Sequence, residues 1–230
     1  MFAIAATKNW DDYVDQAEEV ARGAGFQDLR DRILGLVRPS AGEAAVDIGA
    51  GTGLLTLALA PEVDSVCAVD ISPRMLDYLC TKAASSQISN VRTVVGSAIS
   101  LPIADSSIDI VVSNYCLHHL SDSDKRRALH EAFRVLRPGG RLVFADMMFG
   151  LGVADRRDRR VLAQKVRALI GKGPAGVVRL IRNALRILTG QWERPARTDW
   201  WERTLTETGF IDVQVVALDH ECGIAQARRA

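Results

Sequence analysis

The sequence predicts an α/β fold in which one open, doubly wound, mostly parallel sheet carries helices on both faces. Short apolar runs alternate with stretches of helical periodicity, a glycine-rich turn follows the first run, and an acidic residue ends the second. Parallel strands need a crossover, usually a helix, so this alternation is typical of a parallel sheet. The 230 residues suit a single domain that buries a substantial core.

The central elements follow in chain order from the apolar pattern. Two helices are expected ahead of the first strand, over residues 11–22 and 28–37. The runs predicted as strands are 44–48, 65–70, 91–95, 108–113 and 141–147. The helices predicted between them are 54–60, 73–84 and 123–136. Pro138-Gly139-Gly140 is predicted to end the third helix and to turn the chain into the next strand.

A helix and a strand hairpin are predicted at the C-terminal end. The helix covers residues 198–208 and ends at Gly209, and the strands cover 211–218 and 222–228. Their short connection favours antiparallel pairing. The sheet should therefore have seven strands, with the last one antiparallel. The first and fourth strands should be neighbours at the point where the strand order reverses, which is where such sheets bind ligands.

Residues 150–195 interrupt the strand–helix rhythm with two amphipathic helices, near 160–170 and 175–188. Residues 155–203 hold thirteen Lys or Arg and five Asp or Glu, which gives +8 there and −7 in the rest of a chain whose net charge is +1. Three interpretations remain: a substrate lid, a pair of helices on a membrane surface, or a solvated face. We expect a lid, with peripheral membrane contact through the basic helices 155–190 as the alternative.

Composition excludes several classes. Net charge near zero and sparse aromatic residues argue against a nucleic-acid partner. The four cysteines have no metal-ligand spacing, so no metal is expected and a reduced, cytoplasmic location is favoured. No signal peptide or membrane span is predicted. The expected organisation is one domain over 1–230, with N-terminal helices to 43, a cofactor-binding core over 44–147, the lid over 148–197 and the C-terminal helix and hairpin over 198–230.

The glycine-rich turn carries the chemistry. Gly49, Gly51 and Gly53 close the first strand and open a helix, where a ligand can approach the backbone and an anion meets free N–H groups. A dinucleotide fingerprint needs a further glycine where this chain has Leu54, which disfavours a nicotinamide oxidoreductase. Asp70, at the end of the second strand, can accept both hydroxyls of a ribose. The pair predicts a nucleoside ligand at the carboxyl edge of the sheet.

At this point the chain resembles class I S-adenosylmethionine-dependent methyltransferases, from about residue 44 to 147 and in outline over the hairpin. Within that class it is most similar to the group of ubiquinone and menaquinone C-methyltransferases, which act on varied small molecules and lipids. The matching motifs are residues 47–53, Asp70, Gly96-Ser97-Ala98, Ser113-Asn114, Leu117-His118-His119-Leu120 and Arg137-Pro138-Gly139-Gly140. The resemblance implies a Rossmann-like methyltransferase fold, S-adenosylmethionine as cofactor and methyl transfer to a small-molecule or lipid-like acceptor.

The resemblance also implies roles for single residues of the cofactor site. The loop of Gly49, Ala50, Gly51 and Gly53 would lie along the methionine part of the cofactor, with Asp47 near its ammonium group. Asp70 would hold the ribose.

The remaining implied roles concern the adenine and the methyl group. Ile71 and Met75 would flank the adenine, and Asn114 would line the opening toward the sulfonium methyl. Ser97 stands where the family commonly has an acidic residue that binds the adenine amino group. Serine accepts a hydrogen bond but lacks the charge, so backbone groups including those of Ala98 should contribute more.

His118 and His119 are the candidate catalytic residues, because they follow the fourth strand at the mouth of the expected site. Imidazole titrates near neutrality, so either ring can act as a general base. We expect instead that the pair shapes the pocket, since alignment of the acceptor can suffice for methyl transfer. Cys116 has no partner cysteine at useful spacing, which disfavours thiol-based or arsenic chemistry. A nucleoside-binding protein without catalysis remains the alternative function.

Overall fold

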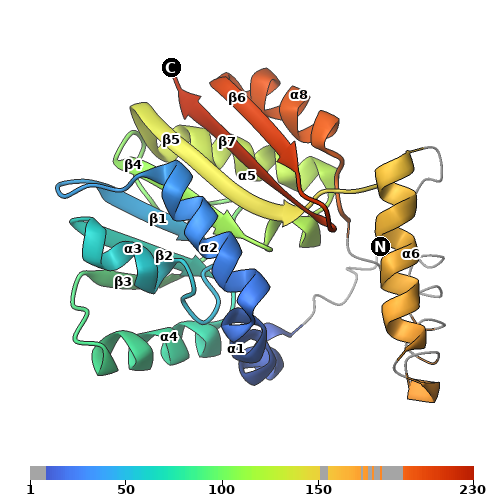
Figure 1. Cartoon of the computed structure of the whole chain (residues 1–230). Helices are drawn as coiled ribbons and strands as arrows, with labels where there is room; N and C mark the ends of the chain where they lie inside the picture. The colour runs from blue at the N-terminus through green and yellow to red at the C-terminus, as the bar shows by residue number, and fades with distance from the viewer. Residues whose placement is uncertain (1–8, 151–154, 172, 176–177, 179–181, 183–193) are drawn as a thin grey trace, which may run out of the picture.

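The computed structural model describes residues 9–150, 155–171, 173–175, 178, 182 and 194–230. Within them the chain forms one seven-stranded sheet of order β3-β2-β1-β4-β5-β7-β6 (Figure 1). The number of strands and the adjacency of β1 and β4 are as predicted. β7 runs antiparallel to both β5 and β6, whereas β1 pairs in parallel with β2 and β4. The strands are β1 Ala44–Ile48, β2 Ser65–Asp70, β3 Val91–Val95, β4 Ile108–Asn114, β5 Leu136–Met147, β6 Phe210–Ala217 and β7 Cys222–Arg229.

The helices cover the two faces of this sheet in separate groups. α2, α3 and α4 contribute Leu29, Leu59 and Leu76 to the packing on one face, whereas α5 and α8 contribute Leu129 and Trp201 to the other. The described helical segments are η1 Trp10–Tyr13, α1 Val14–Arg22, α2 Ala24–Val37, α3 Thr56–Leu59, η2 Ala60–Glu62, α4 Pro73–Ser85, η3 Leu117–His119, α5 Asp122–Val135, α6 Arg156–Ile170 and α8 Thr198–Thr208.

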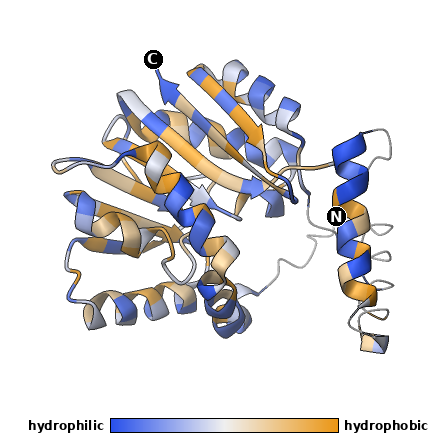
Figure 2. Cartoon of the chain, in the orientation of Figure 1, coloured by the Kyte–Doolittle hydropathy of each residue, from blue (hydrophilic) through white to orange (hydrophobic). Residues whose placement is uncertain are grey.

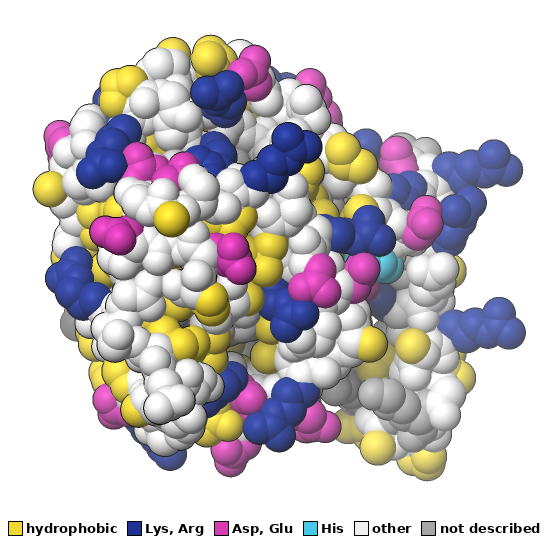
Figure 3. Space-filling model, turned by 60° about the vertical axis from the view of Figure 1, so that its left-hand side comes forward, with side chains coloured by type: hydrophobic (Ala, Val, Ile, Leu, Met, Phe, Trp, Pro, Cys, Tyr) yellow, Lys and Arg dark blue, Asp and Glu magenta, His cyan; other side chains and the backbone are white. Residues whose placement is uncertain are grey.

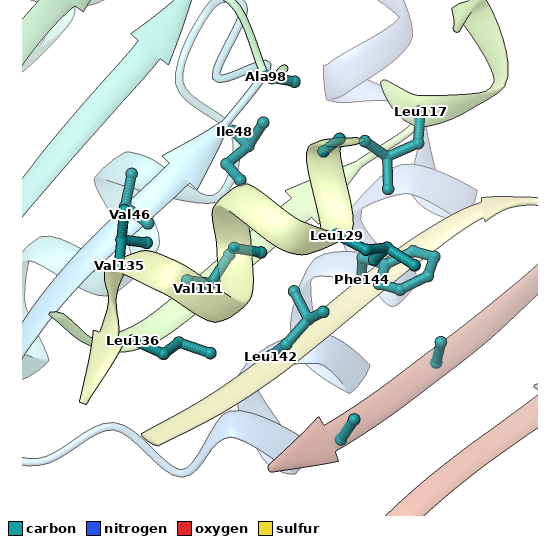
Figure 4. Packing of buried hydrophobic residues seen from close by; sticks show 14 of the residues in the cluster. Val46, Ile48, Ala98, Val111, Leu117, Leu129, Val135, Leu136, Leu142 and Phe144 are labelled. Carbon is teal, nitrogen blue, oxygen red and sulfur yellow. The ribbon is translucent and has the colours of Figure 1, made fainter. Parts of the chain in front are cut away.

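Alternate strand residues fill the two cores, as the period of two in a strand requires. Val46 and Ile48 of β1 point to the face of α5, where they lie near Val111, Leu129 and Phe144 (Figure 4). All five are at most 3% exposed. The strands that carry the glycine loop and Asp70 are therefore fixed on both faces, and the carboxyl edge of the sheet is a rigid platform.

Several predicted boundaries differ from those of the structure. The helix predicted over 54–60 is only α3, one short turn, because the chain leaves the positive-φ turn of Gly53 late and the 3-10 turn η2 begins at Ala60. Pro138-Gly139-Gly140 does not precede the fifth strand but lies inside β5, which begins at Leu136. The pairing of β4 with β5 shifts between Ile108 and Ile110, and Gly139 has φ +81°, so the motif forms an irregular stretch of strand.

The insertion leaves the sheet after β5. α6 stands to one side of the sheet and is longer than the predicted helix 160–170, because Asp155 caps it by accepting hydrogen bonds from Arg157 and Asp158 (Figures 1 and 2). The helix predicted over 175–188 lies almost entirely outside the described residues. Among the helices that the structure describes, none has the length and apolar content to cross a bilayer.

Candidate active site

The glycine loop connects β1 to α3 in a backbone shape that glycine makes possible. Gly49, Gly51 and Gly53 have φ values of +71°, +51° and +92°, in the left-handed region that side chains disfavour. A Cβ atom on Gly49 would lie 2.3 Å from Sγ of Cys116, whereas one on Gly51 would meet no atom within 4 Å. The loop is thus packed tightly at its start and open at Gly51.

Asp47 lies under this loop and is 2% exposed. Its Oδ2 atom accepts a hydrogen bond of 2.6 Å from the Thr56 hydroxyl. Burial raises the pKa of the Asp47 carboxyl to about 7, and the nearby charge of Asp70 adds to that rise. A cationic group placed beside Asp47 would favour its ionised form.

Asp70 ends β2 and connects the loop to α4. Its Oδ2 accepts from the Gly51 N–H at 2.8 Å, and its Oδ1 accepts from the Ser72 N–H at 2.9 Å. Burial raises the pKa of Asp70, while these backbone hydrogen bonds act in the opposite direction. The carboxylate therefore sits beside the open part of the loop, where each oxygen can accept a further hydrogen bond.

The residues predicted around an adenine lie at the ends of β2 and β3. Ile71 is 51% exposed, whereas Met75 is 3% exposed and packs in the first turn of α4. Ile71 thus offers an apolar surface, and Met75 lies in the layer behind it. Ser97 pairs with Ser100 in an isolated antiparallel β-bridge, next to the buried Ala98.

Asn114 is the last residue of β4, which is the neighbour of β1, and Cys116 follows that strand. Oδ1 of Asn114 is one of the buried side-chain atoms that have no hydrogen-bond partner among the residues that the structure describes. Such an atom is costly unless something donates to it. The Cys116 thiol lies against Gly49, and burial raises its pKa, so it stays protonated and is a poor nucleophile.

His118 and His119 form the 3-10 turn η3 directly after these residues. His118 is 4% exposed, and its Nδ1 lies 2.5 Å from Oδ1 of Asp146. The backbone N–H of His118 donates to the other oxygen of the same carboxylate at 3.0 Å. His119 is exposed, and the centroid of its ring lies 3.9 Å from the centroid of the His118 ring. Asp146 was not a predicted site residue. The signal that could have identified it is its charge, because it is an acidic residue within the largely apolar strand 141–147.

These observations fit a nucleoside-type ligand that carries an amino acid. The open space at Gly51, the exposed Ile71 and the unpartnered Asn114 oxygen lie along one sheet edge, together with the carboxylates of Asp47 and Asp70. A ribose would meet Asp70, and an ammonium group would meet Asp47. Within the described ranges, no three His, Cys, Asp or Glu side chains gather as metal ligands would.

Comparison with known proteins agrees with this geometry. Residues 46–144 match the family profile of the methyltransferase domain. A phosphoethanolamine N-methyltransferase of Haemonchus contortus, solved with phosphoethanolamine and S-adenosylhomocysteine, has a TM-score of 0.54 and 28% identity over 60% of this chain and 31% of its own.

Two curated relatives align over a longer stretch. The 27-O-demethylrifamycin SV methyltransferase of Amycolatopsis mediterranei is 32% identical over 74% of this chain and 60% of its own length. An uncharacterized methyltransferase of Geobacillus thermodenitrificans is 30% identical over 72% of this chain and 71% of its own. The chain spans 47%, 39% and 61% of the length of the first three curated relatives that it matches. Because the Geobacillus alignment extends over most of both proteins, and because the glycine loop and Asp70 fall within the profile match, the chain belongs to the S-adenosylmethionine-dependent methyltransferases.

Proposed function

We propose that the protein transfers a methyl group from S-adenosylmethionine to a hydroxyl oxygen of a small organic molecule, with His118 as the general base. When bound, the cofactor supplies an electrophilic methyl group on a sulfonium sulfur. The observation that carries the choice of oxygen is the buried contact between His118 and Asp146, and this proposal replaces the expectation that the two histidines only shape the pocket. An acceptor hydroxyl must lose its proton as it is methylated, whereas a tertiary amine or thioether has no proton to lose.

Asp146 prepares His118 for this role in two ways. Its carboxylate accepts a hydrogen bond from Nδ1–H of His118, so Nε2 is left as the nitrogen that takes up a proton. The same carboxylate accepts from the backbone N–H of His118 and from that of Met147. The imidazole is therefore fixed in one tautomer and one orientation before an acceptor arrives, as catalysis by positioning requires.

Residues 148–197 are proposed to form the lid over the acceptor. The two ends of this insertion meet, because Nη1 of Arg197 lies 2.9 Å from Oδ2 of the buried Asp158 at the start of α6. Next to this pair, the backbone N–H of Arg194 donates to the carbonyl of His118 at 2.8 Å. A change in the insertion can therefore reach the candidate base directly.

Peripheral membrane contact through the basic helices 155–190 stays a prediction. Arg156, Arg160 and Arg167 are exposed on α6, as are the apolar Val166 and Ile170. Lys and Arg side chains also project from the right-hand margin of the space-filling view (Figure 3). Replacing the three arginines with glutamine should then lower binding to anionic phosphatidylserine vesicles at low salt, and neutral vesicles are the control.

Membership in the group of ubiquinone and menaquinone C-methyltransferases also stays a prediction. It would make carbon, not oxygen, the atom that receives the methyl group. The test is S-adenosylhomocysteine formation with a panel of phenols and alcohols, each paired with its methyl ether, an amine and a thiol of the same skeleton. Product with the hydroxyl compound and none with the ether supports the proposal. Turnover only with amines or thiols, or methylation of a ring carbon, contradicts it. Cofactor binding without turnover across the panel favours the non-catalytic alternative.

A further inference from the structure

The segment of residues 9–22, which comprises η1 and α1, contacts both sides of the cofactor site. It lies outside the part of the chain that matches the family profile. We call it the N-terminal strap. Figure 1 shows α1 beside α4, and contacts join α4 to both η1 and α1. Three groups of side-chain contacts connect the strap to the site.

The first connection is made by Asp11. Its Oδ1 accepts a hydrogen bond of 2.5 Å from the hydroxyl of Ser72 and a longer one of 3.3 Å from the backbone N–H of Arg74. Ser72 is 1% exposed and donates its own backbone N–H to Asp70. Asp11 is therefore joined to the predicted ribose ligand through one residue.

The second connection is made by Glu18, which is 6% exposed. Its Oε2 lies 2.8 Å from Nζ of Lys82, and the same ammonium donates to the Thr52 carbonyl at 3.1 Å. Burial alone would raise the pKa of Glu18, but hydrogen bonds from Lys82 and Thr52 outweigh it and lower that pKa. Glu18 is thus an ionised group that ties α1 to the glycine loop itself.

The third connection reaches the other wall of the site. The ring of Trp10 meets the ring of His119 edge-on, with centroids 4.6 Å apart. His119 belongs to η3, which follows β4, whereas Ser72 and Lys82 belong to the segment that follows β2. The strap therefore extends from the cofactor wall to the wall that holds the candidate catalytic residues.

Between its connections the strap is not packed continuously on α4. A hollow of about 500 Å³ lies between the two, and its lining includes Asp12 and Asp15 of the strap and Arg74, Asp77 and Tyr78 of α4. The strap is held at separate points beside this open hollow, and this arrangement suits a segment that detaches and returns.

We propose that the N-terminal strap is the outer wall of the cofactor site, that Asp11 and Glu18 are the positioning residues that fasten it, and that cofactor exchange requires their release. The inference rests on the assignment of the S-adenosylmethionine site, not on the identity of the acceptor. A fastened strap slows both entry and exit of the cofactor. Loosening it should therefore raise both rate constants and change the dissociation constant less.

The experiment measures association and dissociation of S-adenosylhomocysteine by stopped-flow fluorescence in the full chain, without any acceptor. Glu18→Gln and Asp11→Asn should each raise both rate constants about tenfold, the scale of a lost charge-assisted hydrogen bond. Glu19→Gln is the matched control for Glu18, because Glu19 is exposed and adjacent. Asp12→Asn serves the same purpose for Asp11. Both controls should stay within about twofold of the parent in both rate constants.

The possible outcomes distinguish a failure of the strap proposal from a failure of the cofactor-site assignment. A dissociation rate that rises while the association rate stays constant would show that Glu18 only shapes the loop, and the strap proposal would be overturned. Unchanged rates in both variants would overturn it as well. Absence of binding by the parent protein would overturn the cofactor site and the strap together. If Glu18→Gln does not fold, the partly exposed Asp11 carries the test alone.

Discussion

Nδ1 of His118 and Oδ1 of Asp146 lie 2.5 Å apart, and neither side chain is more than 4% exposed. Pairs of this kind are found where a histidine must keep one tautomer and one orientation. The partner sits 28 residues further along the chain, at the end of the neighbouring strand β5. The contact thus depends on the adjacency of β4 and β5. It also distinguishes the two histidines, because His118 is buried against Asp146 whereas His119 is exposed.

The first prediction concerns this pair. His118→Gln and Asp146→Asn should each lower kcat by about 10²–10⁴, because the first removes the base and the second removes the carboxylate that orients it. His119→Gln is the control and should keep kcat within about tenfold of the parent. Turnover with any accepted hydroxyl compound checks this. A kcat near the parent value in both the His118 and the Asp146 variant, with S-adenosylhomocysteine binding intact, would contradict the base assignment.

The second prediction concerns Asp70. Asp70→Ala should weaken S-adenosylmethionine binding by about 1.5–3 kcal/mol, because the ribose hydroxyls lose a charge-assisted acceptor. Asp70→Asn should weaken it less, since one amide oxygen remains. Calorimetric titration measures both, with the exposed Asp64→Asn as the control. Unchanged affinity in a folded Asp70→Ala protein would remove the ribose assignment.

The third prediction separates two glycines of one loop. A Cβ on Gly53 would lie 2.2 Å from Cδ1 of Leu79, at φ +92°, so Gly53→Ala should lower the free energy of unfolding by about 1–3 kcal/mol. Gly51 has open space beside it, so Gly51→Ala should cost about 1–2 kcal/mol of stability from its left-handed backbone and weaken cofactor binding at least tenfold.

Thermal unfolding and calorimetric titration with S-adenosylhomocysteine distinguish the two effects. Gly35→Ala, in α2 with no atom within 4 Å of the added methyl group, is the control. It should stabilise the protein slightly, by about 0.5–1 kcal/mol, because alanine is the better helix former. Full cofactor affinity in Gly51→Ala would show that the open space is not part of the binding site.

The fourth prediction is a proton linkage at Asp47. Its pKa in the protein is raised to about 7, so the carboxyl is largely protonated below that pH, whereas in the unfolded chain it is ionised above about 4. The raised pKa means that this group's contribution to stability without cofactor decreases as pH rises from about 4 to 7. A cofactor ammonium favours the ionised carboxyl, so binding should release a proton and weaken as pH falls from about 8 to 5.

Calorimetry in buffers of different ionisation enthalpy counts the released proton. Asp47→Asn should abolish the release and flatten the pH dependence of affinity in this range. Proton release that persists in this variant would assign the linkage to another group.

Local pattern was enough to predict the sheet, the position of the glycine loop after β1 and the position of Asp70 at the end of β2. Each of these depends on residues close in the chain, such as Asp47 to Gly53, or on a period of two within a strand. The contact of His118 with Asp146 could not be predicted in this way, because it needs the register of β4 against β5. The same is true of Glu18 and Lys82, which lie 64 residues apart and have no shared period.

Errors in the predicted elements have equally particular causes. Pro138 and the two glycines after it have the composition of a turn, yet β5 continues through them because positive φ at Gly139 is compatible with an irregular strand. The helix predicted over 54–60 included residues that still belong to the turn after Gly53, whose φ is positive, and a last residue that belongs to the 3-10 turn η2.

The pair of Arg197 and Asp158 has a consequence for how this protein can diversify. The residues that it joins are 39 positions apart in sequence yet in direct contact, so the segment between them begins and ends at the same place on the domain. The entropy of closing such a loop grows only slowly with its length. If this segment is the proposed acceptor lid, it can be exchanged between relatives as one unit, with the Asp158 and Arg197 positions kept. Such an exchange should change which acceptor is methylated and leave β1 to β5 and the glycine loop unaltered.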